Sequence, residues 1–463
     1  VPFYTRSMVY TMPEFLERRY NPQSRTILSV ISLVSYVLTK VAVTVYAGGL
    51  VFQQVFGIKE LWGIDFFWIA AIGLVVLTAL YTIFGGMKSV LYTSVLQTPI
   101  LLLGSLIILV LGFKELGGWD EMMRVCGAVT VNNYGDTMTN LIRSNDDANF
   151  PWLGALIGSA IIGFWYWCTD QFIVQRVLSG KNEMEARRGT IFGAYLKLLP
   201  VFLFLIPGMI AFALHQKYIG AGGEGFLPML ANGTANADAA FPTLVAKLLP
   251  AGVKGLVVCG ILAALMSSLA SLFNSSAMLF TIDFYKRFRP ETPEKKLVGI
   301  GQVATVVIVI LGILWIPIMR SVGDVLYTYL QDVQSVLAPG IAAAFLLGIC
   351  WKRTSAQGGM WGLIAGMVIG LTRLGAKVYY SNAGEVADST FKYLFYDMNW
   401  LFFCGWMFLF CIIVVIVVSL ATKAPTAEKI QGLVFGTATK EQKAATRASW
   451  NHWDIIHTVI ILA

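Results

Sequence analysis

Long apolar runs dominate this chain of 463 residues and constrain its fold more than any other feature. A run of about 20 apolar residues is long enough to cross the hydrocarbon core of a bilayer as an α-helix. Lipid offers the backbone no hydrogen-bond partners, so only helices and closed barrels can span it, and runs of this length are helical. The sequence predicts an all-α integral membrane protein with an incomplete span from Trp453 onward and ten complete spans, at approximately 27–56, 63–84, 90–113, 152–175, 191–214, 254–284, 298–319, 325–350, 358–378 and 399–422.

The composition supports a membrane protein. It argues against a nucleic-acid-binding protein and against a protein built on zinc sites or disulfides. Hydrophobic residues make up 57% of the chain and charged residues 13%, with a mean hydropathy of +0.70, whereas soluble domains carry about 25% charged residues. The net charge of +8 does not indicate a nucleic-acid partner, because the basic residues are spread over short loops. The six cysteines contain no CxxC pair, which argues against a zinc site or a disulfide framework.

Basic residues concentrate in alternate loops and so predict the orientation in the membrane. The richer set of loops begins with the N-terminal segment and holds 21 lysines and arginines, against ten in the other set. The positive-inside rule places the richer set in the cytoplasm. We therefore expect a short cytoplasmic connection around Lys88, between the spans at 63–84 and 90–113, a cytoplasmic loop at 423–452 and an extracellular loop at 114–150.

One stretch inside a predicted span is unusually rich in aromatic and polar groups. Residues 165–176 read WYWCTDQFIVQR, where a helix in contact with lipid is uniformly apolar. Hydrocarbon cannot satisfy an amide, a carboxylate or an indole N–H, so such residues face a protein interior or a water-filled path and indicate a functional site. The alternative is an aromatic belt followed by an ordinary helix end at the interface.

A face of small residues and hydroxyls lies within the span at 254–284. Ala264, Ser267, Ser268 and Ser271 are spaced so that they share one side of a helix. Neutral oxygen ligands suit a weakly held monovalent cation. Small residues also allow transmembrane helices to pack closely. The residues alone leave both interpretations open.

Two further polar residues stand within otherwise apolar spans. Lys197 lies about 10 Å along its helix, from where it either extends to the interface or reaches a polar substrate. Pro200 and Pro207 predict kinks in the same span, because proline frees backbone groups of a helix from their hydrogen bonds. Gln331 offers two donors and an acceptor to a hydroxyl-rich ligand. Polar groups in kinked helices are typical of secondary transporters, and the chain contains no phosphate-binding GxxxxGK[ST] motif for direct use of ATP.

These motifs resemble those of a known family. Over nearly its whole length, the chain is similar to the sodium/glucose cotransporters of the solute:sodium symporter family. The pieces that carry the resemblance are TMPEFLERRY (11–20), ALYTIFGGMKSVLYT (79–93), WYWCTDQFIVQR (165–176), AYLKLLP (194–200), SSLASLFNSS (267–276), QSVLAPGIAAAFLLGICWKR (334–353) and GLVFGT (432–437).

The resemblance implies a five-plus-five inverted-repeat transporter fold with extra C-terminal helices. Residues 1–113 then form the remainder of the first repeat, whose first broken helix is expected to be missing from this chain. An extracellular loop follows at 114–150, and the second repeat occupies 151–350. Residues 351–463 are additional C-terminal helices, with the cytoplasmic loop at 423–452. On this expectation, the sequence as given lacks part of each ligand site.

The resemblance also implies a sugar site. Tyr166 matches an aromatic gate that covers the sugar on the cytoplasmic side, and Trp167 matches its neighbouring pocket wall. Lys197 and Gln331 match partners of the sugar hydroxyls. Gly163 stands where relatives place a polar side chain toward the sugar, which puts one substrate hydrogen bond in doubt.

A sodium site is implied in the same way. Ala264, Ser267 and Ser268 match the half of the site that this helix contributes, and Ser271 neighbours a second sodium position in some members. Ser94 replaces a carboxylate that several members keep at that point. Because the loss of this acid weakens a second site, we expect one sodium ion per sugar.

These expectations together describe a multi-pass plasma-membrane symporter and no enzyme. It uses the sodium gradient to accumulate a hexose, glucose or galactose, by alternating access. Its partners are then a small-molecule sugar, sodium and the lipid bilayer, with no nucleic acid, and the sequence leaves its oligomeric state undetermined. One alternative is a sodium symporter for inositol, a nucleoside or a carboxylate. Another is a sugar sensor or leak that binds without accumulating.

Overall fold

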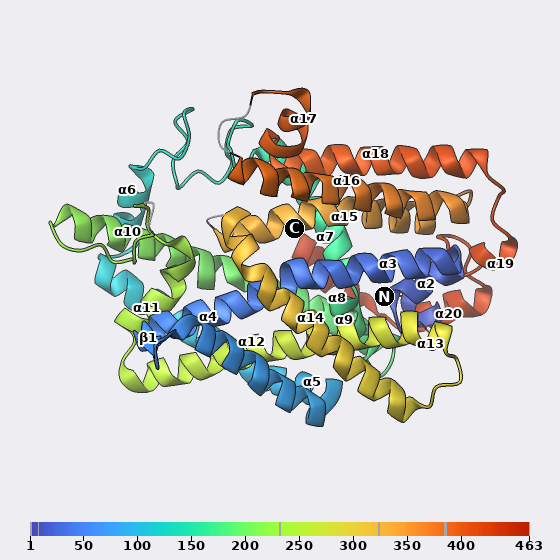
Figure 1. The fold of residues 1–463 in the computed structure, drawn as a ribbon, viewed down its shortest axis with the longest axis horizontal. Helices are drawn as coiled ribbons and strands as arrows, with labels where there is room; N and C mark the ends of the chain where they lie inside the picture. Colours follow the sequence, from blue (N-terminus) through green and yellow to red (C-terminus); the bar gives the residue numbers. More distant parts are fainter. Residues whose placement is uncertain (1, 8, 231–232, 323–324, 384–386, 463) are drawn as a thin grey trace. The chain divides into compact units, whose positions relative to one another are not determined.

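A computed structural model describes residues 2–7, 9–230, 233–322, 325–383 and 387–462. The described chain is almost entirely helical and includes a small hairpin of β1 (Glu60–Leu61) and β2 (Ile64–Asp65) (Figure 1). The longer helices are α3 (Pro22–Ser35), α4 (Ala42–Phe56), α5 (Phe66–Leu116), α7 (Trp152–Cys168), α9 (Glu183–Pro200), α10 (Ile206–Gly220), α12 (Ala251–Met278), α14 (Glu294–Val322), α15 (Leu326–Cys350), α16 (Ala356–Asn382) and α18 (Trp400–Ala421).

The remaining elements are short, and several continue a longer helix. The π-helical segments η1 (Tyr36–Val41), η2 (Val201–Leu205) and η4 (Leu279–Tyr285) join α3 to α4, α9 to α10 and α12 to α13. The other short elements are α1 (Pro2–Ser7), α2 (Met12–Arg19), α6 (Trp119–Gly127), α8 (Gln171–Leu178), η3 (Ala237–Ala239), α11 (Ala240–Leu248), α13 (Lys286–Phe288), α17 (Thr390–Lys392), η5 (Tyr393–Asp397), α19 (Ala427–Ile430), α20 (Lys440–Ala448) and α21 (His452–Leu462).

Within the described residues, eight helices or helix runs are long and apolar enough to cross a membrane, and the bent pair α7 and α8 brings the number to nine. The prediction of a multi-pass all-α protein is confirmed. The backbone is helical throughout α5, and its two apolar parts, Phe66–Leu80 and Ser94–Leu116, flank the predicted connection around Lys88, whose side chain lies outside the described residues.

The chain folds into two compact units, each built from separate segments of the sequence. The first unit comprises residues 1–39, 149–195 and 275–463, and the second comprises 40–148 and 196–274. Each unit therefore combines parts of both predicted repeats.

The core of the first unit is a group of four mutually packed helices, α7, α15, α16 and α18. Glycines allow α15 and α16 to approach closely. A methyl group added at Gly340 would lie 2.9 Å from the Cα of Gly366, and one added at Gly370 would lie 2.3 Å from the carbonyl oxygen of Val336. Small residues at crossings are the usual device for close packing of transmembrane helices, because lipid gives no hydrophobic drive for their association.

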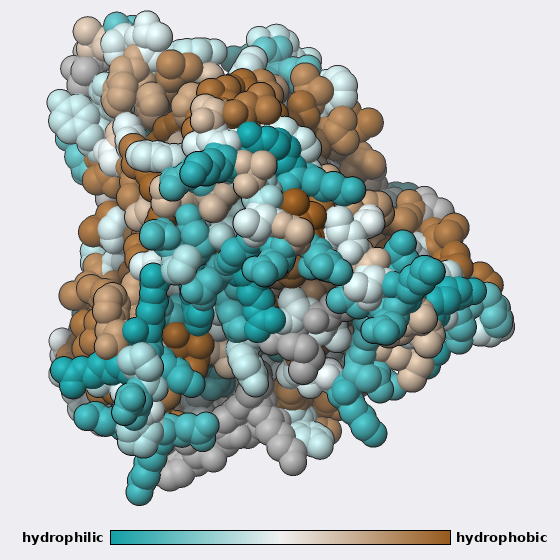
Figure 2. Space-filling model, turned by 90° about the vertical axis from the view of Figure 1, so that its right-hand side faces the viewer, coloured by the Kyte–Doolittle hydropathy of each residue, from teal (hydrophilic) through white to brown (hydrophobic). Residues whose placement is uncertain are grey.

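One end of the first unit is polar. The elements α2, α13, α19 and α20 lie there (Figure 1), and Figure 2, which looks onto this end, shows hydrophilic side chains gathered across it. Arg19 from α2 is 1% exposed, and its guanidinium donates to the carbonyl oxygens of Gly348 and Trp351 at 2.7 and 3.2 Å. These carbonyls lie at the C-terminal end of α15, where the helix itself supplies no donors. The prediction that the N-terminal segment and the basic loops share one side agrees with this arrangement within the first unit.

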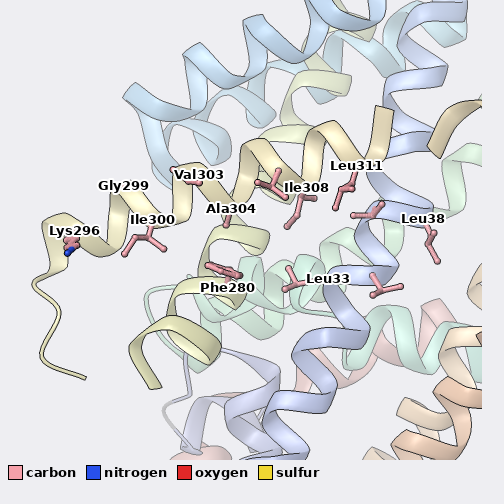
Figure 3. Close-up of a pocket in the computed structure, with 13 residues that line it drawn as sticks. Leu33, Leu38, Phe280, Lys296, Gly299, Ile300, Val303, Ala304, Ile308 and Leu311 are labelled. Atoms are coloured by element: carbon pink, nitrogen blue, oxygen red, sulfur yellow. The ribbon is translucent and has the colours of Figure 1, made fainter. Parts of the chain in front are cut away.

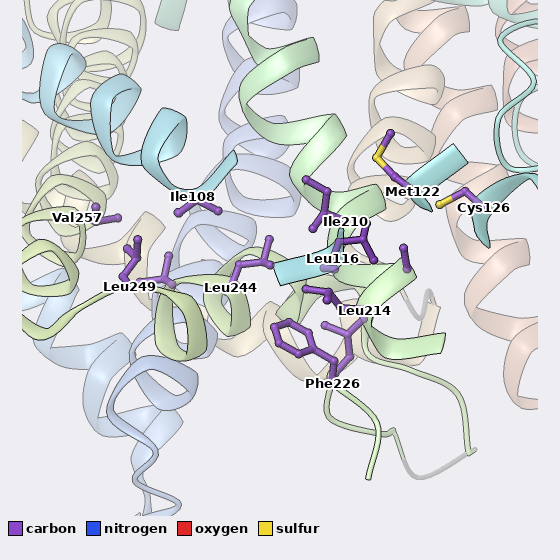
Figure 4. Packing of buried hydrophobic residues seen from close by; sticks show 14 of the residues in the cluster. Ile108, Leu116, Met122, Cys126, Ile210, Leu214, Phe226, Leu244, Leu249 and Val257 are labelled. Atoms are coloured by element: carbon purple, nitrogen blue, oxygen red, sulfur yellow. The ribbon is translucent and has the colours of Figure 1, made fainter. Parts of the chain in front are cut away.

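The second unit has its own apolar core, formed by α5, α6, α10, α11 and α12 (Figure 4). Ile108 of α5, Ile210 of α10 and Leu244 of α11 are all at most 1% exposed. Lys217 donates from Nζ to the carbonyl oxygen of Leu116 at 3.0 Å, which satisfies the C-terminal end of α5. The core thus holds the two helices, α5 and α12, that carry the predicted sodium ligands.

Candidate functional site

The aromatic and polar stretch at residues 165–176 contains a break between two helices. The axes of α7 and α8 differ by 46°, where the sequence predicted one continuous span. Asp170 begins α8 as its N-cap, with its carboxylate accepting from the backbone N–H of Phe172 at 3.2 Å. The hydroxyl of Tyr36 donates to the same carboxylate at 3.0 Å. A carboxylate that caps a helix start stabilises it, so the Thr169–Asp170 pair is a signal of the break that the sequence analysis passed over.

Tyr166 and Trp167, the predicted sugar gate and pocket wall, lie in the last turn of α7 before this break. Tyr166 is partly buried, whereas Trp167 is 49% exposed. Their ring centroids are 5.1 Å apart with an edge-to-face angle of 83°. A helix end beside a break can reorient without disturbing the rest of the span. The position of this aromatic pair is therefore compatible with a movable cover.

Gln331 lies in the same unit, near the start of α15, and is partly buried. Helices α7 and α15 pack against each other, so the structure places Tyr166 and Gln331 on neighbouring helices. Two further polar residues of this run are more deeply enclosed. Gln334 is 6% exposed, and Ser335 is fully buried and donates to the carbonyl oxygen of Asp332 at 2.6 Å.

Next to Gln331 the structure contains a buried ionic cluster that the sequence analysis did not predict. Lys377 of α16 donates from Nζ to Oδ2 of Asp332. The Nη2 atom of Arg373 lies 3.8 Å from Oδ1 of Asp332, and Arg373 is completely buried. Its guanidinium also covers the ring of Phe403, 4.1 Å from the centroid. The sequence contained a signal of this cluster. The acid Asp332 lies inside an apolar span and requires a partner, and the cations Arg373 and Lys377, four residues apart, share one face of another helix.

The predicted sodium face lies in the second unit, on α12. Ser267 and Ser271 are 7% and 0% exposed, and Ala264 and Ser268 are partly buried. The hydroxyl oxygens of Ser267 and Ser94 are 2.7 Å apart and share a hydrogen bond that joins α12 to α5. The two positions that the resemblance linked to different sodium sites are thus neighbours. Neutral oxygens in a largely apolar setting fit a weakly held monovalent cation.

Lys197 also belongs to the second unit, near the end of α9, and its side chain is exposed. Directly after Pro200 the helix changes to the π-helical segment η2, which ends two residues before Pro207. The predicted irregularity at these prolines is therefore present, and proline is a common cause of it. The predicted residues fall into two groups, with Tyr166, Trp167 and Gln331 in the first unit and Lys197 with the hydroxyl face in the second.

The described chain combines many apolar spans with a helix that breaks at an aromatic and acidic pair. Polar side chains are enclosed within the spans, and this combination is typical of a membrane transporter. The chain belongs to the sodium:solute symporter family, which it matches over residues 1–366.

Relatives in this family cover nearly all of the chain. It is 37% identical to a sodium/mannose cotransporter of Bos taurus, with 95% of this chain and 75% of the relative covered. It is 35% identical to sodium/myo-inositol cotransporter 2 of Homo sapiens, covering 94% and 66%, and 37% identical to sodium/glucose cotransporter 1 of Ovis aries, covering 91% and 65%. The chain therefore spans about two thirds to three quarters of the length of these relatives.

A solved structure is similar in fold. It is a sodium-coupled sialic acid symporter in a substrate-bound, outward-open state, with a TM-score of 0.69 and 21% identity, covering 92% of this chain and 80% of that one. The family and this fold together confirm the prediction of a five-plus-five inverted-repeat transporter that couples solute transport to sodium. Sodium is accordingly a transported partner of the protein.

Proposed function

We propose that this protein accumulates a hexose, glucose or galactose, by sodium-coupled symport across the plasma membrane. The observation that carries the proposal is the aromatic pair Tyr166 and Trp167, which ends α7 at its break and lies on a helix packed against the one that bears Gln331. Aromatic faces and an amide suit a ring with many hydroxyls, because the ring faces are apolar and the hydroxyls need both donors and acceptors. The relatives named for glucose and mannose transport support a hexose.

In this proposal each predicted site residue has a separate role. Tyr166 covers the sugar on the cytoplasmic side, and Trp167 forms part of the pocket wall. Lys197 and Gln331 hydrogen-bond the sugar hydroxyls. The site belongs to a second repeat at 151–350.

Sodium binds, in our proposal, to the half-site formed by Ala264, Ser267 and Ser268 on α12. The ion favours the outward-open state, in which the sugar pocket is assembled, and the sugar then permits the change to the inward-open state. Each sodium ion that moves inward across 100 mV contributes about 2.3 kcal/mol, before any concentration gradient is counted. One ion per sugar is expected, because Ser94 replaces a carboxylate that several members of the family keep, and the loss of this acid weakens a second sodium site.

Myo-inositol is the second candidate substrate, because a myo-inositol cotransporter covers 94% of the chain at 35% identity. Inositol and a hexose present similar rings of hydroxyls, and the same aromatic and amide groups suit both. A sensor or leak that binds sugar without accumulating it is the alternative of a different class. Only accumulation above equilibrium separates a symporter from these, since binding alone cannot produce it.

The test is uptake of radiolabelled glucose, galactose, mannose and myo-inositol into proteoliposomes that contain the full-length protein. We expect accumulation of a hexose that requires a sodium gradient and collapses when the gradient is dissipated. Accumulation of inositol alone would select the second candidate, and sodium-independent equilibration would indicate a leak.

The site assignment is tested separately, with Gln331→Ala and Lys197→Ala in the same liposomes. Both variants should insert normally and lose uptake. Normal uptake by both would contradict the site assignment and leave the substrate assignment in place.

A further inference from the structure

An apolar groove runs along the outside of the first unit (Figure 3). Its volume is about 710 Å³, which is within the range of about 300–1,000 Å³ typical of ligand pockets. Three segments form it. Leu33 of α3 and Leu38 of η1 line one wall, Phe280 of η4 lies between the walls, and α14 forms the other wall from Lys296 to Leu311.

The lining has one polar side chain, and it stands at an end of the groove. Lys296 lies at the start of α14, whereas the other lining residues of that helix are glycine, alanine, valine, isoleucine and leucine. From Lys296 to Leu311 the wall is about 22 Å long at 1.5 Å per residue. This exceeds the depth of about 15 Å of hydrocarbon in one leaflet. The groove is therefore long, apolar and charged at one end, as an extended amphiphile is.

The charge at this end is part of a larger basic segment. Between residues 286 and 296 the chain carries five basic and two acidic residues, a net charge of +3. The guanidinium of Arg287 already has a partner within the protein, because its Nη1 atom donates to the carbonyl oxygen of Pro22 at 2.9 Å. Lys296 is exposed and forms no ion pair with any residue that the structure describes. Its charge is thus available to an anion at the mouth of the groove.

We infer that this groove binds an anionic glycerophospholipid, with an acyl chain between α3 and α14 and the phosphate at Lys296. The basic loop lies at the polar end of the unit, which the charge pattern predicts to face the cytoplasm. Basic pockets between transmembrane helices on this side are suited to anionic headgroups. Charge complementarity separates this occupant from a zwitterionic lipid, in which the choline cation offsets the attraction of the phosphate to Lys296.

The inference can be tested by a substitution that fills the groove, because one wall has open space for a larger side chain. A methyl group added at Gly299 meets no atom within 4 Å, and the same holds at Gly208 on α10 of the second unit. A large side chain at Gly299 therefore occupies the groove without forcing the helices apart. Gly208 offers the matched control outside the groove. Lys295 is the matched control for charge, because it precedes Lys296 and does not line the groove.

The experiment is native mass spectrometry of the full-length protein in a neutral detergent, titrated with phosphatidylglycerol or phosphatidylcholine of identical acyl chains. We expect phosphatidylglycerol to bind about fivefold more tightly, the contribution of one lysine near a headgroup. Lys296→Gln should remove this preference, while Lys295→Gln should keep it within twofold. Gly299→Phe should weaken both lipids more than tenfold, with Gly208→Phe unchanged.

Several results would overturn the inference. Equal binding of the two lipids by the wild-type protein would show that no anion is recognised. If Lys296→Gln and Lys295→Gln lost the preference for phosphatidylglycerol equally, the anionic lipid would be attracted to the basic surface in general and not to the groove. Full lipid retention by Gly299→Phe would place the lipid elsewhere, and displacement by inorganic phosphate would reduce the site to one for a free anion. A membrane protein that co-purifies and excludes lipid from the groove would show a different occupant.

Discussion

At the scale of single residues, the hydrogen bond between Ser94 and Ser267 connects the proposed sodium half-site with the position that we expect to decide how many ions are bound. The two hydroxyl oxygens are 2.7 Å apart, and Ser267 is nearly buried. A carboxylate at position 94 would stand beside this hydroxyl. In a partly enclosed setting, an unpaired carboxylate strongly favours a bound cation, because its own desolvation is otherwise uncompensated.

We therefore predict that Ser94→Asp raises the coupling ratio from one sodium per sugar to two. The measurement is the reversal potential of sugar-dependent sodium current in proteoliposomes, which depends directly on the ratio. Ser94→Asn is the control, since it has nearly the same shape without the charge and should keep a ratio of one. A ratio of two in the wild-type protein would contradict the expectation for Ser94 itself.

Residue types were predictable from the sequence, but several of their partners were not. Gln331 was singled out because its amide offers two donors and an acceptor to a hydroxyl-rich ligand. The sequence does not show which cation faces the neighbouring Asp332, because Lys377 lies 45 residues further along the chain. In the same way, Ser94 and Ser267 are 173 residues apart, and their hydrogen bond depends on how α5 and α12 pack.

At the scale of helices, the ionic cluster fixes α15 against α16. Lys377 is bonded to Asp332, and both side chains are largely buried. Removal of one partner from a buried pair leaves the other charge uncompensated and costs about 3–5 kcal/mol. Replacement of both partners by neutral groups removes that penalty.

Lys377→Met should therefore lower the free energy of unfolding by about 3 kcal/mol. The effect should fall at the low end of the usual range, because Arg373 remains 3.8 Å from the carboxylate. The double variant Asp332→Asn/Lys377→Met should recover only part of the loss, because the buried guanidinium of Arg373 then lacks its carboxylate partner. Thermal unfolding in detergent, followed by the solubility of the protein, measures both effects. Equal losses in the single and double variants would mean that the pair does not act as a unit.

The same two helices are also held at a short distance by glycine. A methyl group at Gly370 would lie 2.3 Å from the carbonyl oxygen of Val336, whereas one at Gly375 of the same helix meets no atom within 4 Å. Gly370→Ala should destabilise the protein by about 1–3 kcal/mol, as overpacking does. Gly375→Ala should be neutral or slightly stabilising, because alanine is the better helix former. The melting temperatures of the two variants test this difference in stability. Equal values would show that α15 and α16 can move apart to accommodate the added methyl group at no cost.

The helices themselves show which local signals predicted the fold and which did not. Long apolar runs predicted most spans, because no other structure satisfies the backbone in lipid. The break between α7 and α8 was predictable in principle from the helix-capping Asp170.

At the scale of the whole molecule, the two groups of site residues belong to different units. Ser267 lies in the second unit, and Gln331 lies in the first. If both ligands favour the same conformation, the coupling between them is a free energy shared by the whole protein. Linkage then requires that sodium tightens sugar binding by the same factor by which sugar tightens sodium binding.

Ser267→Ala should accordingly weaken sodium binding and raise the sugar concentration needed for half-maximal binding at low sodium. At saturating sodium the sugar affinity should return to the wild-type value, because the substitution leaves the sugar pocket intact. Gln331→Ala should show the reverse pattern, with weaker sugar binding and sodium binding that is normal in the absence of sugar. Equilibrium binding of both ligands to the full-length protein measures the two factors, typically 5–150-fold in coupled systems. Unequal factors would mean that the ligands act on more than one conformational change, and a factor of one would show that the two units bind their ligands independently.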